Sequence, residues 1–259
     1  MFGQVAFADF DSLLEAARLD GRVVGMVLTG SRGRGVFVHP ASDWDVCLLV
    51  RDGDMFECEK RFATPHGALI EVVVLSLTGF TELGAMGSAT EWDRYSYAHS
   101  QVLIDKLDGR IGNLVAEKGV LPPDAAPRIA SHALDTYINS YYRSKKNLRN
   151  GLTIEAHLDA VESISPLLTT LFALHGRLRP FNKFLRWELE NFPLDGDVWS
   201  AQALLPRLQT IVATGDLGEQ ERLFRDVEET VRKLGFGEVV DGWEPDVAWL
   251  RGERLASDG

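Results

Sequence analysis

The chain lacks the features that mark secreted, membrane-spanning or zinc-binding proteins. Its 259 residues include two cysteines, Cys47 and Cys58, whose spacing matches no metal or redox motif, so we expect reduced thiols. No apolar run approaches the length of a membrane span, and the N-terminus has no positively charged segment followed by an apolar core. The six histidines form no His-x-x-x-His or Cys/His pattern. We therefore expect a cytoplasmic protein without a secretory signal, and we predict no zinc site.

Basic residues are also scarce relative to acidic ones. The chain has 27 Lys and Arg residues against 38 Asp and Glu residues, which gives a net charge of −11. An acidic protein repels nucleic acid at long range, so nucleic acid is disfavoured as a partner, although a local basic patch is not excluded. The acidic balance suits a small cationic substrate, but many acidic enzymes have no such substrate.

The first part of the sequence predicts a sheet interleaved with short helices. Apolar, β-branched runs predict strands over residues 23–28, 45–50 and 68–75 and a short strand over 101–105. Helical patterns cover 11–19, a stretch after Thr78, 91–99 and 110–117. The proline-rich segment 121–127 then predicts a linker.

Beyond this linker the pattern is entirely helical. Residues 128–150 and about 153–175 have apolar side chains at helical spacing, and we expect Pro166 to bend or divide the second of these helices. Shorter helices are predicted over 182–191, 200–213 and 217–234. The fold class is therefore α+β, with a mixed-sheet domain over 1–120 and an all-helical domain over 127–250.

The most informative stretch lies between the first two predicted strands. The glycine-rich segment Thr29–Gly35 has backbone N–H groups that few side chains obstruct, which suits a polyphosphate. Asp43 and Asp45 follow, and because they are two residues apart on an extended chain they project to the same side. Carboxylates beside phosphates are typical ligands of Mg²⁺. The stretch predicts a magnesium-dependent site for a nucleoside triphosphate, whereas either part alone is common in turns and strand ends.

Gly30-Ser31, followed about a dozen residues later by Asp43-x-Asp45, resembles the signature of the nucleotidyltransferase superfamily of the DNA polymerase β type. That superfamily includes aminoglycoside adenylyltransferases, lincosamide nucleotidyltransferases and nucleotidyltransferase toxins. The resemblance implies that Gly30 and Ser31 bind the β- and γ-phosphates of ATP or another triphosphate. It also implies that Asp43 and Asp45 bind Mg²⁺.

Glu71 is the candidate for a third carboxylate. It is the single charge in the apolar run 68–75, where an ionised carboxylate is costly unless it is paired or metal-bound. The resemblance to aminoglycoside adenylyltransferases implies that Glu71 is the catalytic base, and the metal site would then comprise Asp43, Asp45 and Glu71. The alternative is a salt bridge from Glu71 to Arg32 or Arg34.

A second group of polar residues lies on the first two helices of the helical domain. Asn139, Arg143, Lys146 and Asn147 share one helical face, and Glu155, Asp159 and Glu162 share another. These faces indicate either solvated surfaces or a salt-bridge seam between the helices, which is the interpretation we adopt for Lys145 and Arg149. For Arg143 and Lys146 we favour contacts to the phosphates.

Lys183 is a second basic candidate. Asn182 is expected to cap the following helix, which places Lys183 in a first turn where the helix dipole disfavours a cation, and this suggests a nearby anion. The stretch from Tyr137 to Leu189 resembles, more loosely, the C-terminal helical domain of bacterial small-molecule nucleotidyltransferases.

Together these features predict an enzyme that transfers a nucleoside monophosphate, AMP in the first instance, from a triphosphate to a hydroxyl of a small acceptor such as an aminoglycoside. One alternative keeps the chemistry and changes the acceptor to tRNA or protein. The other is a nucleotide-binding regulatory module without catalysis, which the intact Asp43, Asp45 and Glu71 disfavour.

Overall fold

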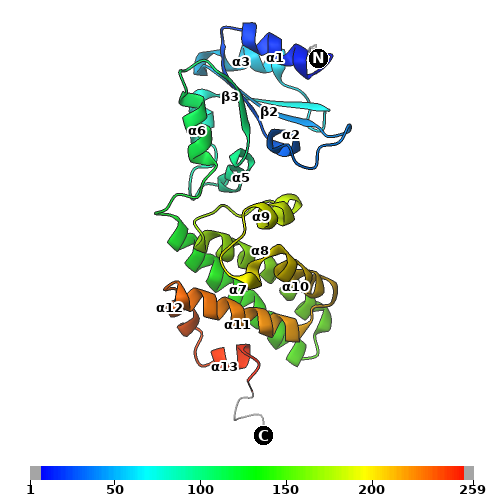
Figure 1. Ribbon diagram of the computed structural model, residues 1–259, viewed down its shortest axis with the longest axis vertical. Coiled ribbons are helices and arrows are strands. Elements are labelled where there is room, and N and C mark those ends of the chain that lie inside the picture. Colours follow the sequence, from blue (N-terminus) through cyan, green and yellow to red (C-terminus); the bar gives the residue numbers. More distant parts are fainter. Residues whose placement is uncertain (1–6, 254–259) are drawn as a thin grey trace. The chain divides into compact units, whose positions relative to one another are not determined.

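The computed structural model describes residues 7–253, which divide into two compact units between Val120 and Leu121 (Figure 1). The first unit contains the sheet and the second is helical, so the predicted α+β class is confirmed. No helix among the described residues is both long and apolar enough to cross a lipid bilayer.

A four-stranded mixed sheet forms the centre of the first unit. Its strands are β1 (Val23–Leu28), β2 (Trp44–Val50), β3 (Ile70–Ser76) and β4 (Gln101–Asp105), in the order β3-β2-β1-β4. β1 is antiparallel to both β2 and β4, whereas β2 and β3 run parallel. The helices of this unit are α1 (Phe10–Leu19), α2 (Gly30–Arg34), α3 (Met55–Phe62), α4 (Leu77–Glu82), α5 (Arg94–Tyr97) and α6 (Arg110–Lys118).

Each face of this sheet is covered by helices. Alternate residues of a strand point to opposite faces, so Val46 and Leu48 of β2 pack with α1 and α3, while Cys47 and Leu49 pack with α4, α5 and α6. Both cysteines are free and buried.

The third strand differs from its prediction. The sequence predicts a buried strand over 68–75, but β3 begins at Ile70 and lies at the edge of the sheet. Val73 is 49% exposed, and β3 pairs on one side only, with β2, in the sheet that the described residues form. An apolar run therefore does not by itself establish burial on both faces.

The second unit is a helical assembly built around two long helices. α7 (Ala126–Arg149) and α8 (Thr153–Leu174) are followed by α9 (Leu185–Asn191), α10 (Ala201–Thr214), α11 (Leu217–Lys233), α12 (Gly237–Asp241) and α13 (Val247–Leu250). α8 is continuous through Pro166. Of the two predicted outcomes, a bend or a division of the helix, the division is therefore wrong.

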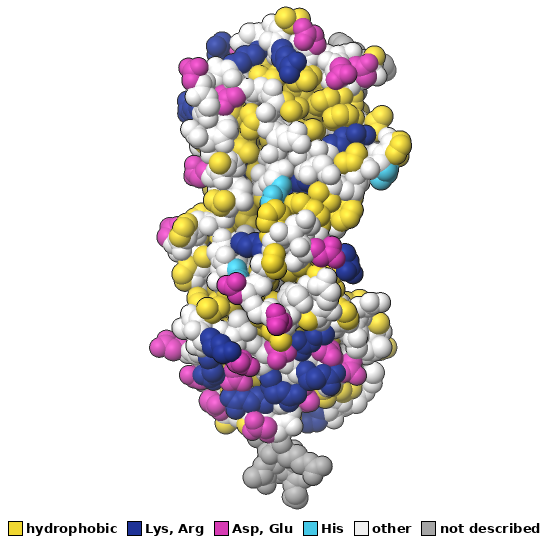
Figure 2. Space-filling model, viewed as in Figure 1, with side chains coloured by type: hydrophobic (Ala, Val, Ile, Leu, Met, Phe, Trp, Pro, Cys, Tyr) yellow, Lys and Arg dark blue, Asp and Glu magenta, His cyan; other side chains and the backbone are white. Residues whose placement is uncertain are grey.

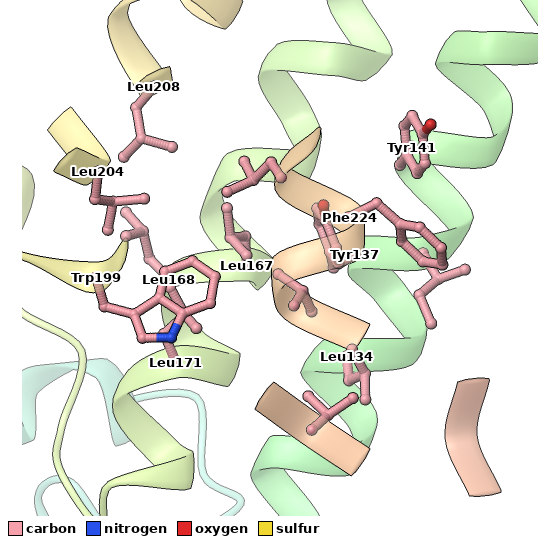
Figure 3. Close-up of a cluster of buried hydrophobic side chains, with 14 of the residues drawn as sticks. Leu134, Tyr137, Tyr141, Leu167, Leu168, Leu171, Trp199, Leu204, Leu208 and Phe224 are labelled. Atoms are coloured by element: carbon pink, nitrogen blue, oxygen red, sulfur yellow. The ribbon is translucent and has the colours of Figure 1, made fainter. Parts of the chain in front are cut away.

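One apolar core holds the second unit together. Tyr137 and Tyr141 of α7 face Phe224 of α11, and leucines of α8 face Trp199, which is 1% exposed (Figure 3). The C-terminal segment joins this core, since the Tyr141 hydroxyl donates a hydrogen bond of 2.6 Å to the carbonyl of Leu250. α13 (Val247–Leu250) is thereby joined to α7.

Candidate functional site

The candidate site is built where β1 ends and α2 begins. The segment predicted as an open loop forms the short helix α2, whose hydrogen bonds use the N–H groups of Gly33, Gly35 and Val36. The first turn of a helix has N–H groups without partners inside the helix, so the turn from Gly30 is the part suited to phosphate oxygens. Gly33 packs against the strand, because a Cβ at this position would lie 2.3 Å from the Leu28 carbonyl oxygen.

Asp45 lies directly against this turn. Its backbone carbonyl accepts hydrogen bonds from the Thr29 N–H at 2.9 Å and the Thr29 hydroxyl at 3.3 Å. Gly30 has a φ of +61°, and a Cβ added to it would lie 1.8 Å from Oδ2 of Asp45. The carboxylate therefore occupies the space that any other residue at position 30 would fill with its side chain.

Trp44 fixes the side to which Asp45 points. Its ring stacks on Phe10 with 3.8 Å between centroids, and the Arg32 guanidinium lies 4.2 Å from the ring centroid of Trp44. Within β2, Asp45 follows Trp44 and therefore points to the opposite face of the sheet. Asp43 is exposed and Asp45 is partly buried. Asp45 is the second residue of β2, and Asp43 directly precedes the strand. That the two carboxylates act together stays a prediction.

Glu71 pairs with Asp45 in the register of the parallel strands β2 and β3, so the two side chains leave the same face of the sheet. No arginine within residues 7–253 contacts the Glu71 carboxylate, so the predicted alternative with Arg32 or Arg34 is wrong. Its Oε1 lies 2.7 Å from Nδ1 of His66, and its Oε2 accepts the Gly67 N–H at 2.9 Å. The hydrogen bond from Gly67, followed by that from His66, lowers the pKa of Glu71 below its usual range.

Arg32 and Arg34 instead hold the glycine-rich turn in place. Arg32 donates from Nε and Nη2 to the Ser42 carbonyl, at 3.0 and 2.9 Å. Arg34 donates to the Gly30 carbonyl at 3.1 Å and to the Tyr95 carbonyl. Sequence reasoning considered these arginines only as partners of Glu71. Only Arg34 bonds to the backbone of the glycine-rich segment itself, whereas Arg32 ties that segment to the residue before Asp43.

The donor set at this site suits a hard cation shared with phosphate. Mg²⁺ is commonly held by one or two carboxylates together with substrate oxygens, and Asp43 and Asp45 provide two carboxylates at one strand end. Within residues 7–253, no three His, Cys, Asp or Glu side chains are grouped so that they could hold a metal ion. Glu71 is hydrogen-bonded to His66 and Gly67, and its role as a third metal ligand stays a prediction.

The second unit places Arg143 in a salt-bridge seam. Its guanidinium lies 2.7 Å from Asp159 and 2.7 Å from Glu162, and Asn147 donates to Asp159 at 2.8 Å. This is the inter-helix seam that the sequence left open as the alternative to phosphate contacts. Because two carboxylates already balance its charge, Arg143 is not part of the function proposed below.

Lys145 and Lys146 are adjacent but have different surroundings. Lys145 is 6% exposed, and its ammonium pairs with Glu221 of α11 and donates to the Trp249 carbonyl at 2.6 Å. The sequence predicts that Lys145 is either solvated or part of a salt-bridge seam with α8. Both predictions are wrong for Lys145. Lys146 is exposed, with its ammonium 5.9 Å from the ring centroid of Tyr142.

Lys183 lies in a 3₁₀ turn, Asn182–Phe184, that precedes α9. Its ammonium is 5.5 Å from the ring centroid of Phe184. Asn182 does not cap a helix as predicted, because its side-chain oxygen accepts a hydrogen bond from Arg179 at 3.0 Å. The roles of Lys146 and Lys183 toward a triphosphate stay predictions.

No protein-family model and no curated protein sequence matches this chain. Among solved structures, a nucleotidyltransferase-like protein from Exiguobacterium sibiricum is similar, with 11% sequence identity and a TM-score of 0.42. The match covers 89% of this chain and 77% of that protein. A likeness this distant carries no argument about activity, so the proposals below rest on the residues of this chain.

Proposed function

We propose that this protein is a nucleotidyltransferase that transfers a nucleoside monophosphate, AMP in the first instance, from a triphosphate to an acceptor hydroxyl. The observation that carries this proposal is the Asp45 carboxylate seated against Gly30, with Glu71 in register on the neighbouring strand. A turn that offers N–H groups to phosphates, with carboxylates for a cation and for a proton beside it, supports phosphoryl-group chemistry.

Each residue has a distinct role in the proposed reaction. Gly30 and Ser31 bind the β- and γ-phosphates through the first turn of α2, while Asp43 and Asp45 hold Mg²⁺. When bound, Mg²⁺ supplies positive charge that balances the phosphates and the departing pyrophosphate. Glu71 accepts the proton of the acceptor hydroxyl, whose oxygen forms a bond to the α-phosphorus while the bond to pyrophosphate breaks. Positioning and charge balance, without a covalent enzyme intermediate, supply most of the rate.

Lys146 and Lys183 are proposed to bind the triphosphate and to balance charge on the leaving pyrophosphate. Both lysines are exposed residues of the helical unit, and their ammonium groups lie 5.9 Å from the ring centroid of Tyr142 and 5.5 Å from that of Phe184. Replacing each lysine in turn by alanine is expected to raise the KM for the triphosphate or to slow transfer for at least one of them, with the melting temperature unchanged.

A small, hydroxylated and cationic acceptor, such as an aminoglycoside, is the preferred substrate class. The net charge of −11 attracts a cationic molecule and repels polyanions at long range. This part of the proposal rests on charge alone and is separate from the assignment of the catalytic residues.

A polynucleotide or protein acceptor is the second candidate, and one surface favours it. Lys and Arg side chains gather over α11 (Figure 2), where Arg207, Arg222 and Arg225 line a hollow of about 380 Å³ together with Glu219 and Asp226. However, Arg207 is paired with both acids and Arg222 with Glu219. Because these carboxylates balance most of the charge, the surface is a weak attractant for RNA.

Release of pyrophosphate tests the proposal. The protein is incubated with Mg²⁺ and ATP labelled at the α-phosphate, in parallel with aminoglycosides, tRNA and purified proteins. We expect pyrophosphate release and a labelled aminoglycoside-type product. If tRNA or protein became labelled instead, the acceptor would be the second candidate and not a small molecule. If no mixture released pyrophosphate, the enzymatic function would be contradicted.

A further inference from the structure

The segment between α3 and β3 forms a turn that is fixed to the strand it precedes. The Ala68 N–H donates to the Pro65 carbonyl at 3.2 Å, and Gly67 has the positive φ, +80°, that the third position of a type II turn requires. The Thr64 hydroxyl donates to the Ile70 carbonyl at 2.8 Å and accepts the Val72 N–H at 2.7 Å. The turn 65–68 is thereby anchored to the first residues of β3.

This turn directs two donors at one carboxylate. His66 Nδ1 and the Gly67 N–H contact different oxygens of Glu71, at 2.7 and 2.9 Å. An ionised carboxylate only accepts hydrogen bonds, so the proton of this pair lies on Nδ1 of His66. The contact with Glu71 raises the pKa of His66, and the two donors lower that of Glu71, so the pair favours the ionised carboxylate. Because a carboxylate has about four lone-pair positions, two donors leave room for a further proton or ligand.

Packing does not explain the position of His66. Its side chain is 95% exposed, whereas that of Glu71 is 20% exposed. An exposed pair of this kind contributes little to the free energy of unfolding. Its main physical effect is to restrict rotation of the Glu71 carboxylate.

We propose that His66 is a positioning residue, which together with the Gly67 N–H holds the Glu71 carboxylate in the orientation in which it accepts the acceptor's proton. This inference rests on the proposed function, in which Glu71 is the base. Groups that orient a reacting or ligating carboxylate commonly change activity about 10–100-fold when they are removed.

Kinetics of pyrophosphate release by the full chain test this role, measured in whichever of the acceptor mixtures named above supports release by the wild type. We expect His66→Ala to lower kcat about 10–100-fold while the KM for ATP and the melting temperature stay unchanged. His66→Asn should restore most of kcat, because its amide nitrogen can donate from the place of Nδ1. The matched control is His132→Ala, which removes an exposed histidine of α7. Because His66 is proposed to act through Glu71, His66→Ala should have no further effect in a Glu71→Gln background.

Nitrogen NMR of the His66 ring provides a readout that does not depend on activity. When the His66 ring of the wild type is neutral, its proton should be on Nδ1. In the Glu71→Ala variant the neutral ring should carry its proton on Nε2. An Nε2 proton in the wild type, or full activity of His66→Ala beside an inactive Glu71→Gln, would overturn the role of His66 and leave the proposed function standing. Full activity of Glu71→Gln would instead remove the base from the proposed function.

Discussion

At the scale of single residues, the glycine at position 30 and the carboxylate at position 45 depend on each other. Gly30 has a left-handed backbone conformation. Because glycine has no Cβ, Oδ2 of Asp45 can lie where the side chain of another residue would be. The sequence pattern predicts both residues as functional but not this contact, because spacing along a chain does not define the distance across two antiparallel strands.

Gly30→Ala and Gly35→Ala separate backbone strain from the position of Asp45. Both glycines have a positive φ, +61° and +67°, so each substitution should cost about 1 kcal/mol of unfolding free energy. Only the Cβ at position 30 displaces the carboxylate, since nothing lies within 4 Å of the Cβ position at Gly35. We expect pyrophosphate release to fall at least about 100-fold in Gly30→Ala and less than about threefold in Gly35→Ala. Equal losses in the two variants would contradict a specific role for the contact.

Asp20 provides a residue-scale prediction on stability. It is 7% exposed and accepts hydrogen bonds from Arg22 and Arg61, each at 2.7 Å. The hydrogen bond from Arg22, aided by the charge of Arg61, holds the pKa of Asp20 at about 2, against the opposing effect of burial. A lowered pKa stabilises the fold above the pKa of the unfolded chain, near 3.9, and this contribution is lost as the pH falls from about 5 toward 2.

Urea unfolding between pH 7 and pH 3 measures this contribution. We expect Asp20→Asn to lower the unfolding free energy by about 2 kcal/mol at pH 7 and to show a smaller loss on acidification than the wild type. Asp11→Asn, which removes an exposed carboxylate of α1, is the control and should follow the wild-type curve. Parallel curves for Asp20→Asn and the wild type would contradict the assignment.

At the scale of elements, the pattern of apolar residues predicts strands and helices well but not what surrounds them. β1 and β4 have the predicted bounds, 23–28 and 101–105, because their apolar runs end at turn residues. β3 is also mostly apolar, yet it lies at one edge of the sheet, as β4 lies at the other, and Glu71 remains in contact with solvent. The place of a strand in a sheet follows from pairing between distant segments, which a local pattern does not contain.

The neighbours Lys145 and Lys146 test how α7 is held within the second unit. Lys145→Ala leaves Glu221 and the Trp249 carbonyl without their buried donor, so we expect a loss of about 2–4 kcal/mol in unfolding free energy by urea denaturation. Lys146→Ala removes an exposed side chain and should change the free energy of unfolding by less than about 0.5 kcal/mol. A Lys145→Ala variant as stable as the wild type would show that this pair does not hold α11 and the C-terminal segment to α7.

At the scale of the whole molecule, the change from a sheet-containing unit to a helical unit follows directly from periodicity. The proline-rich segment after Val120 is where the two compact units divide. The sequence also predicts a group of basic residues in the helical unit, but the structure distributes them differently. Arg143 pairs with α8 and Lys145 with α11, because charged side chains pair across helices whose packing is not encoded in any one helix.

The central claim is that Asp45 is required for nucleotidyl transfer, and its most direct test is the rate of Mg²⁺-dependent pyrophosphate release by Asp45→Asn. The substitution keeps the shape of the side chain and removes the charge that a cation requires, so the fold should be retained. We predict a rate lower than that of the wild type by a factor on the order of 10³ or more, with Asp43→Asn behaving similarly. A folded Asp45→Asn protein that releases pyrophosphate within about tenfold of the wild-type rate would contradict the account.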